Sequence, residues 1–426
     1  MNAQKPDRGR QFLSGRRGLR GGAGLWTVLT SAPFHRLLDR IDKGLAAGAI
    51  EAWLPDGSYR IIGGRSPGPV AEVTLTSWRA LLRLARNGSV GWYQAWEKGE
   101  WTSPDPVPLF DLFMRNAVTL GQIARARGLF SAMNKLRHGL NRNSRAGSRR
   151  NIAFHYDLGN DFYQPWLDET MTYSSALFQE PIRPDEELAY AQLNKVRALL
   201  DRLDLKPDQQ LLEIGCGWGT LAEIAADEYG AAVTGITLST EQRDHALALN
   251  RANVNAGRIR IDLTDYRDVA GQYDAIASVE MVEAVGQDYW RTYVEAITRA
   301  LKPGGRAAIQ YIAIDDRIFD RYAAGADFIQ TYIFPGGMLL SESRFAAFCA
   351  EAGLEWRDRR GFGLHYAETL KRWRARFDMA VEAGQLPQGF DERFVRLWRY
   401  YLMYCEGGFR GGGIDVAQVT LVKKGE

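Results

Sequence analysis

A glycine-rich segment at residues 211–220, LLEIGCGWGT, constrains the fold more than any other part of the chain. Leu211, Leu212 and Ile214 have the apolar character of a buried strand, and residues 221–229 have the amphipathic pattern of a helix. The glycines between them permit the unusual dihedral angles of a tight turn. The segment therefore predicts a strand, a turn and a helix, which is the repeating unit of an α/β fold.

The spacing of these glycines indicates which ligand the turn could bind. Glycines let a ligand approach the backbone, and the N-terminus of the following helix offers free N–H groups. Dinucleotide sites usually read G-x-G-x-x-G, with an acidic residue about 20 positions later. Here the motif is E-x-G-x-G-x-G, and the next predicted strand, residues 231–237, is followed by Leu238 and Ser239 without a carboxylate. The pattern favours S-adenosylmethionine (SAM) over NAD, and a turn without a ligand is the simpler alternative.

Strand-like and helix-like segments alternate after this turn. The predicted strands are residues 210–214, 231–237, 258–262, 273–279, 305–312, 354–361 and 416–422. Right-handed crossovers would join them into a doubly wound, Rossmann-like α/β sheet of seven strands. Helical insertions at residues 315–350 and 366–404 are expected to line the substrate pocket, because ligands bind at the carboxyl ends of such strands.

Residues 31–116 predict a separate, small α+β domain. A helix at residues 34–45 is followed by a hairpin around the Pro55-Asp56-Gly57 turn, a strand at residues 71–75 and a helix at residues 77–86. The later part is rich in aromatic residues, namely Trp92, Tyr93, Trp96 and Trp101. Such an interior could hold a lipid chain, or these side chains could simply fill a small core.

Charge is unevenly distributed along the chain although its total is nearly balanced. The 54 Lys and Arg residues face 51 Asp and Glu residues, so the overall charge gives no argument for binding nucleic acid. Residues 1–30 are basic and are predicted to be disordered. Residues 117–150 form a basic linker, which could simply be solvated or could lie on anionic phospholipid, where each basic residue contributes about 1 kcal/mol.

The three cysteines, Cys216, Cys349 and Cys405, are widely spaced. This pattern indicates neither a disulfide framework nor a metal site, so a reducing compartment is expected. We also expect no membrane span, because no apolar segment is long enough.

Several segments together resemble the cyclopropane-fatty-acid synthase family. They are LEIGCGWGTLAEIAADEYGAAVTGITLSTEQ, HYDLGNDFY, MTYSSALF, DYRDVAGQYDAIASVEMVEAVG, YIFPGGML, FGLHYAETLKRW and YYLMYCEGGFRGGGIDVAQVTL. The resemblance covers residues 151–426 and implies a class I SAM-dependent methyltransferase domain. Residues 31–116 are more weakly similar to the family's N-terminal, sterol-carrier-like lipid-binding domain.

The resemblance also implies a reaction and its partners. Family members transfer a methyl group from SAM to the double bond of an unsaturated acyl chain, within membrane phospholipid for those that carry the N-terminal domain. A sulfonium is already electrophilic, so no metal or protein nucleophile is needed. We therefore expect a cytoplasmic enzyme that associates peripherally with the inner face of the membrane, and its oligomeric state stays open between a monomer and a homo-oligomer.

Five candidate catalytic residues follow from the resemblance. In cyclopropane-forming relatives the base is a bicarbonate ion held by a glutamate, a tyrosine, a histidine and groups beside two cysteines. The first two match Glu283 and Tyr366, and one cysteine matches Cys405. Gln310 replaces the histidine and Ser175 replaces the other cysteine, although the Ser175 N–H could still bind an anion. Because glutamine does not titrate near neutral pH, the use of bicarbonate stays open, as does the choice between a cyclopropane ring and a methylene- or methyl-branched chain.

The candidate cofactor-binding residues lie at the ends of the first three predicted strands of the sheet and in the segment that precedes it. They are Tyr173, Ser174, Glu213, Gly215, Gly217, Thr237, Leu238, Gln242, Thr264 and Asp265. The glycine turn is expected to approach the methionine part of SAM, the end of the second strand its ribose, and the end of the third strand its adenine.

Two other functions stay open from the sequence. A methyltransferase for a soluble hydroxyl or amine acceptor would share the SAM motif but would need no membrane. A noncatalytic lipid carrier would retain the fold without binding SAM.

Overall fold

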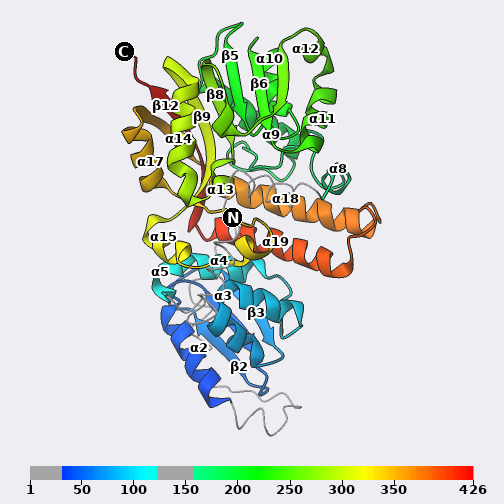
Figure 1. Cartoon of the computed structure of the whole chain (residues 1–426). Helices are drawn as coiled ribbons and strands as arrows, with labels where there is room; N and C mark the ends of the chain where they lie inside the picture. Colours follow the sequence, from blue (N-terminus) through cyan, green and yellow to red (C-terminus); the bar gives the residue numbers. More distant parts are fainter. Residues whose placement is uncertain (1–30, 122–157, 426) are drawn as a thin grey trace. The chain divides into compact units, whose positions relative to one another are not determined.

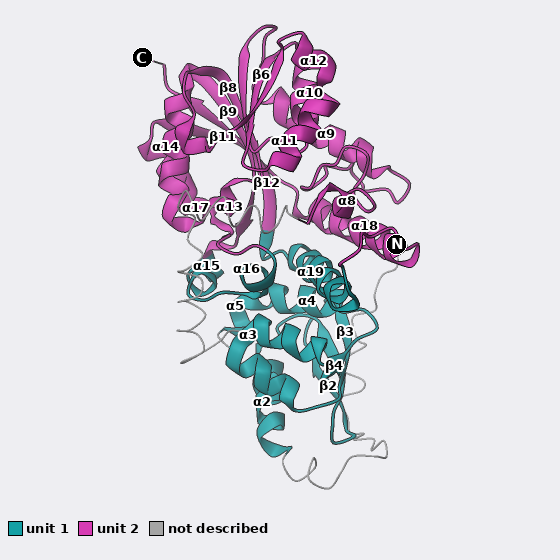
Figure 2. Ribbon diagram, turned by 45° about the vertical axis from the view of Figure 1, so that its right-hand side comes forward, with its two compact units in different colours: residues 1–138, 317–333, 390–414 teal, residues 139–316, 334–389, 415–426 magenta. Residues whose placement is uncertain are grey.

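The computed structural model describes residues 31–121 and 158–425. The chain divides into two compact units, which Figure 2 distinguishes by colour. Unit 1 combines residues 1–138, 317–333 and 390–414, and unit 2 combines residues 139–316, 334–389 and 415–426. The predicted disorder of residues 1–30 and nearly all of the predicted basic linker lie outside the described residues. The predicted domain boundaries stay predictions.

Unit 2 is built around the predicted sheet (Figure 1). Its strands are β5 (Gln210–Ile214), β6 (Ala232–Thr237), β7 (Ile259–Leu263), β8 (Tyr273–Val279), β9 (Leu301–Ile314), β11 (Leu354–Gly361) and β12 (Ile414–Lys423). The order β11-β12-β9-β8-β5-β6-β7 confirms the seven-stranded, doubly wound arrangement, and the short strand β10 (Leu340–Ser341) adds an eighth strand beside β9. The five strands from β9 to β7 are parallel, whereas β11 and β12 are antiparallel.

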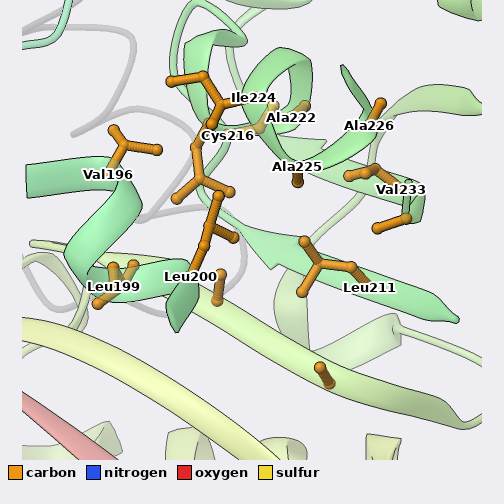
Figure 3. Packing of buried hydrophobic residues seen from close by; sticks show 14 of the residues in the cluster. Val196, Leu199, Leu200, Leu211, Cys216, Ala222, Ile224, Ala225, Ala226 and Val233 are labelled. Carbon is orange, nitrogen blue, oxygen red and sulfur yellow. The ribbon is translucent and has the colours of Figure 1, made fainter. Parts of the chain in front are cut away.

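Helices connect these strands. They are α8 (Asn160–Tyr163), α9 (Leu188–Asp201), α10 (Thr220–Asp227), α11 (Thr240–Leu249), α12 (Arg251–Asn255), α13 (Val282–Val285), α14 (Trp290–Ala300), α17 (Glu342–Glu351) and α18 (Gly363–Glu382). Figure 3 shows apolar side chains of α9 and α10 packed against β5 and β6. Cys216 belongs to this core, and burial raises the pKa of its thiol well above the usual range.

The strand order reverses between β5 and β8, where the chain starts a second set of crossovers. Ile214 pairs with Ser278, and Val279 pairs with Gln310. The residues that follow β5 and β8 therefore emerge at the same edge of the sheet. This position, at the carboxyl ends of parallel strands beside a reversal of strand order, is where open α/β sheets bind ligands.

Unit 1 contains a smaller sheet with the strand order β2-β1-β3-β4. Its elements are α2 (Ala32–Gly44), β1 (Ala49–Trp53), β2 (Tyr59–Gly63), β3 (Val70–Leu75), α3 (Arg79–Glu97), β4 (Trp101–Thr102), α4 (Val107–Arg115), α5 (Ala117–Leu120), α15 (Asp316–Ala323), α16 (Phe328–Tyr332) and α19 (Glu392–Arg410). The hairpin is confirmed, with β1 antiparallel to β2. Helix α3 runs beyond the predicted end because the chain only kinks at Gly88, which has φ 55°, and then resumes the helix.

Aromatic side chains form much of the interior of unit 1. The ring of Tyr93 lies 4.9 Å from that of Phe328 and 5.0 Å from that of Tyr400. Trp92 and Trp101 stack at 4.5 Å. These aromatics pack against one another, and the lipid-binding role of this region stays a prediction. None of the helices in the described parts of the chain is long and apolar enough to cross a membrane.

Candidate active site

The glycine turn after β5 leaves room for a ligand at one position. Gly215, Gly217 and Gly219 have φ values of 82°, 52° and 98°. A Cβ atom on Gly219 would lie 2.8 Å from the Cβ of Ala246, so packing requires glycine there. A Cβ atom on Gly217 would meet nothing within 4 Å. The backbone at Gly217 therefore borders open space that a ligand can enter.

Glu213, on β5, brings a buried carboxyl group to this end of the sheet. Among the described residues its Oε2 atom has no hydrogen-bond partner. Burial raises its pKa to about 8, although the nearby Lys195 opposes this shift. Desolvation lowers the pKa of Lys195 to about 8, and its Nζ atom donates to Ser174 Oγ at 2.5 Å. A buried oxygen without a partner, beside open backbone, fits a ligand that carries hydrogen-bond donors, as SAM does.

Two residues predicted at the ribose end of SAM contact each other directly. The hydroxyl of Thr237 donates to Gln242 Oε1 at 2.8 Å, and both side chains are buried. Gln242 belongs to α11, but its side chain is buried against the end of β6 and is not exposed. Leu238 is only partly buried.

Two further cofactor candidates follow β7. Thr264 is partly buried, and its N–H donates to the Thr237 carbonyl at 3.1 Å. Asp265 is buried and accepts from the Arg267 backbone N–H at 3.0 Å and from Arg267 Nε at 2.8 Å. Much of the hydrogen-bonding capacity of Asp265 is thus used locally, and its place beside the adenine stays a prediction.

The segment before α9 contributes the remaining cofactor candidates. The Tyr173 ring packs 5.2 Å from Trp373 and 5.4 Å from Tyr163. The Ser174 carbonyl accepts from Gln192 Nε2 at 2.9 Å, in addition to the Lys195 contact of its hydroxyl. Ser174 is buried, whereas Tyr173 is partly accessible.

A second group of polar residues surrounds Glu280, which directly follows β8. Its Oε1 atom accepts from the Ser175 N–H at 2.9 Å and from Gln310 Nε2 at 2.8 Å, and its Oε2 atom accepts from the Tyr366 hydroxyl at 2.7 Å. These four residues define what we call the carboxylate pocket. Part of Glu280 stays accessible, but the surrounding protein desolvates its carboxyl group and raises its pKa. Lys195 and the three donors oppose that shift.

Glu280 also has an unusual backbone conformation. Its φ value is 48°, in the left-handed region that favours glycine. A residue with a side chain costs roughly 1–2 kcal/mol there. The Glu280 N–H donates to the Gln310 carbonyl at 2.8 Å, which fixes the end of β8 against β9. Such strain is concentrated at functional sites, where the surrounding structure maintains it.

Gln310 is held in place from behind. Its Oε1 atom accepts from Gln418 Nε2 at 3.0 Å, and the same Gln418 nitrogen donates to the Lys195 carbonyl at 3.1 Å. Gln310 and Gln418 are fully buried. Because the Gln310 carbonyl accepts from Gln418, its NH₂ group is directed at Glu280.

Glu283 lies one helical turn further along, in α13. Its Oε1 atom accepts a short hydrogen bond from the Ile312 N–H, and among the described residues its buried Oε2 atom has no partner. Burial, and secondarily the charge of Glu280, raise its pKa to about 8. The Glu283 carboxyl therefore keeps its proton to a higher pH than an ordinary glutamate does.

The structure brings together three of the five predicted catalytic residues, and it does so on a residue that the sequence did not single out. Ser175, Gln310 and Tyr366 all donate to Glu280. Its position directly after a parallel strand, at the ligand-binding edge of the sheet, was the signal that could have identified it. Cys405 lies on α19 in unit 1, so its proximity to the pocket stays a prediction.

The chain is similar to known proteins in both sequence and structure. Residues 143–419 match the family model described as mycolic acid cyclopropane synthetase. The tuberculostearic acid methyltransferase of Mycobacterium tuberculosis is 40% identical over 349 residues, which are 80% of this chain and 81% of that protein. The cyclopropane-fatty-acyl-phospholipid synthase of Escherichia coli K12 is 32% identical over 374 residues, 84% of this chain and 89% of that protein.

Solved structures agree with this match. A mycolic acid cyclopropane synthase in complex with SAH and CTAB superimposes with a TM-score of 0.60 at 31% identity, covering 65% of this chain and 98% of that chain. The fold of unit 2 is therefore that of a class I SAM-dependent methyltransferase.

Proposed function

The chain belongs to the mycolic acid cyclopropane synthetase family of SAM-dependent methyltransferases, and on that premise we propose that it methylates a carbon–carbon double bond of an unsaturated acyl chain in a phospholipid. The observation that carries the proposal is the carboxylate pocket, which holds a desolvated base at the ligand-binding edge of the sheet. Methyl addition to an alkene leaves a carbocation, which needs a nearby base and protection from water.

Different residues at the sheet edge fit SAM binding and stabilisation of the carbocation. Gly217 provides close approach to the backbone, and Glu213 provides a buried oxygen that has no hydrogen-bond partner in residues 31–121 and 158–425, so both fit the amino-acid end of SAM. When bound, SAM supplies an electrophilic methyl group. Tyr173, in the segment before α9, and the aromatic residues around it provide ring faces. Such faces stabilise cations.

The names of the relatives favour a lipid acceptor but differ in product. One is named for tuberculostearic acid and another for cyclopropane-fatty-acyl-phospholipid. Loss of a proton from the transferred methyl group with ring closure gives a cyclopropane. Loss of a proton with formation of a double bond gives a methylene or a methyl-branched alkene. We propose the acyl chain as the acceptor and leave both products as outcomes of the test.

Expression in a bacterial host that lacks modified acyl chains would test the proposal. We expect phospholipid acyl chains to gain the mass of one methylene group, and NMR of the purified fatty acid would distinguish a ring from a branch. An active protein that binds SAM and leaves every acyl chain unmodified would contradict the proposal. Methylation of a soluble hydroxyl or amine without vesicle binding would instead favour the alternative acceptor.

Vesicle binding tests the expected membrane association separately. We propose that the protein binds vesicles containing anionic phospholipid. Added salt should weaken this binding, because salt screens the attraction between basic residues and anionic lipid. Equal binding to neutral vesicles at high salt would contradict an electrostatic contribution.

A further inference from the structure

We propose that the carboxylate of Glu280 is itself the base that removes the proton from the methylated substrate, in place of a separately bound anion. This inference rests on the proposed function and concerns the same pocket. It assigns to the chain a proton acceptor that a bicarbonate-dependent enzyme must take from solution.

The carboxylate pocket contains three hydrogen-bond donors. A backbone N–H, an amide NH₂ and a phenol hydroxyl converge on one point, and such a set of donors is an anion-binding site. Three of the positions that the family resemblance assigns to bicarbonate, Ser175, Gln310 and Tyr366, provide these donors. In this chain they already bind an anion, since each contacts the Glu280 carboxylate at 2.7–2.9 Å.

The glutamine at position 310 also fits a pocket in which Glu280 is the base. Its carbonyl oxygen is fixed by Gln418, so its NH₂ group is a permanent donor to Glu280 at every pH. A side chain that titrates near neutral pH could lose that donor or compete for the substrate proton. Gln310 therefore suits a pocket whose only proton acceptor is the carboxylate.

The Glu280 carboxylate has capacity to accept one more hydrogen bond from a donor. An ionised carboxylate has about four acceptor positions. Among the described residues, Glu280 Oε1 uses two and Oε2 uses one, for the Tyr366 hydroxyl. One position on Oε2 is left, and the residue is partly accessible. The three donors and Lys195 favour the ionised form, which a general base must have.

The backbone at Glu280 is strained. Glycine would adopt the φ value of 48° at this position without cost, yet the chain has a glutamate there. The strain is compensated by the fixed contacts of the side chain. This arrangement indicates that the carboxylate at this point is needed.

The reaction step balances without another reactant. The alkene electron pair forms a bond to the methyl carbon, and the electron pair of the broken carbon–sulfur bond stays on sulfur. The resulting carbocation loses a proton to Glu280 Oε2. The electrons of that carbon–hydrogen bond form either the third side of a ring or a new double bond, and the protonated glutamate later releases its proton to water.

The test uses Glu280→Gly in the full chain. Glycine suits the φ value, so the variant is expected to fold, and the pocket then has three donors without an acceptor. In buffer depleted of carbon dioxide, we expect turnover of the unsaturated phospholipid to fall by roughly 10²–10⁴-fold, the usual contribution of a general base. Added formate or bicarbonate should restore part of the activity and raise the melting temperature in a saturable way. The melting shift needs neither SAM nor lipid.

Glu280→Gln and Glu186→Ala are the controls. Glutamine fills the space without acting as a base, so we expect the same loss as in Glu280→Gly but no restoration by formate. Glu186 is another buried glutamate that accepts a backbone N–H, from Gln179 at 3.0 Å. Its replacement leaves a cavity elsewhere in unit 2, and formate should not alter its turnover.

The outcomes separate the inference from the proposed function. Wild-type turnover that persists without bicarbonate, together with formate rescue of Glu280→Gly, supports the inference. Wild-type turnover that stops without bicarbonate, or full turnover by Glu280→Gln, overturns it while the proposed function stands. A wild-type protein that binds SAM but modifies no acyl chain overturns the proposed function itself.

Discussion

The two halves of the candidate site are assembled differently. The glycine turn is made by consecutive residues after β5, and Glu213 on that strand has a buried oxygen to which no described residue donates. The carboxylate pocket is made by residues that lie 105, 30 and 86 positions from Glu280 along the chain, namely Ser175, Gln310 and Tyr366. One half is local and the other depends on tertiary structure.

The halves also differ in how their polar groups are satisfied. Glu213 has an oxygen without a partner among the described residues, so a ligand must complete it. Glu280 has three donors supplied by the protein itself, and they oppose the rise in its pKa that desolvation causes before any substrate binds. Preorganised groups need no rearrangement during reaction, which is the main advantage of an enzyme over water as a medium. We infer that SAM binding completes the hydrogen bonds of Glu213, whereas the donors to Glu280 are in place before the substrate binds.

The largest effect after replacement of Glu280 is expected from Tyr366→Phe. The change removes one hydrogen bond to a charged group, worth about 1.5–3 kcal/mol, so turnover should fall roughly 10- to 150-fold. Loss of the donor raises the pKa of Glu280 further, whereas Lys195 still lowers it and Glu283 is largely neutral. Because the base must be ionised, the acidic limb of the pH–rate profile should move to higher pH, while SAM affinity stays the same.

A matched control for this change is Tyr229→Phe. Its hydroxyl also donates to a carboxylate, Asp201 Oδ1 at 2.7 Å, but not in the carboxylate pocket. We expect turnover and its pH profile to be unaffected. A Tyr366→Phe enzyme whose acidic limb does not move would show that the tyrosine does not act through Glu280.

The glycine turn could be predicted from the sequence because its determinants are local. Glycine spacing, an apolar strand and an amphipathic helix act over about ten residues, so the turn and all seven main strands could be predicted. The contacts of the carboxylate pocket could not be predicted, because the position of Glu280 after a parallel strand makes it a candidate but does not show which distant residues donate to it. Family resemblance identified Gln310 and Ser175 as departures, but only the contacts explain them, since both donate to Glu280.

Gly217→Ala tests the cofactor half with an intermediate effect. A Cβ atom there meets no protein atom within 4 Å, so it would occupy the space proposed for SAM. We expect SAM affinity to fall about tenfold, equivalent to about 1.4 kcal/mol. Gly271→Ala is the control, because Gly271 also has positive φ, 86°, and open space around its Cβ position.

Calorimetry would measure SAM affinity and thermal unfolding would measure stability. Together they separate the loss of cofactor binding from backbone strain. Both alanine variants should lose roughly 1–2 kcal/mol of stability through backbone strain. Only Gly217→Ala should bind SAM more weakly. Equal affinities in the two variants would place SAM away from this turn and remove the contrast between the two halves.

Gln418→Leu should have a smaller effect on the pocket. Without Gln418 the Gln310 amide can rotate and present its carbonyl to Glu280, which weakens one of three donors. We expect turnover to fall about 5-fold, near 1 kcal/mol, with a small shift of the acidic limb in the same direction as for Tyr366→Phe. Combined with Gln310→Leu, the change should add almost nothing, because both act through one contact. Full additivity in this cycle would contradict a positioning role.

The smallest effect concerns Glu283 and appears in stability. Its pKa is about 8 in the folded protein against 4.5 for the ordinary group, so the folded state binds the proton more tightly than the unfolded state. Its favourable contribution is complete below the unfolded pKa and is lost as pH rises through about 8. Relative to the wild type, Glu283→Gln should therefore gain melting temperature as the pH rises from roughly 5 to roughly 9. Glu228→Gln should instead melt slightly lower at the higher pH, because Arg197 holds the Glu228 pKa below its usual value. A melting difference for Glu283→Gln that does not change with pH would show that the fold does not raise the pKa of this carboxyl.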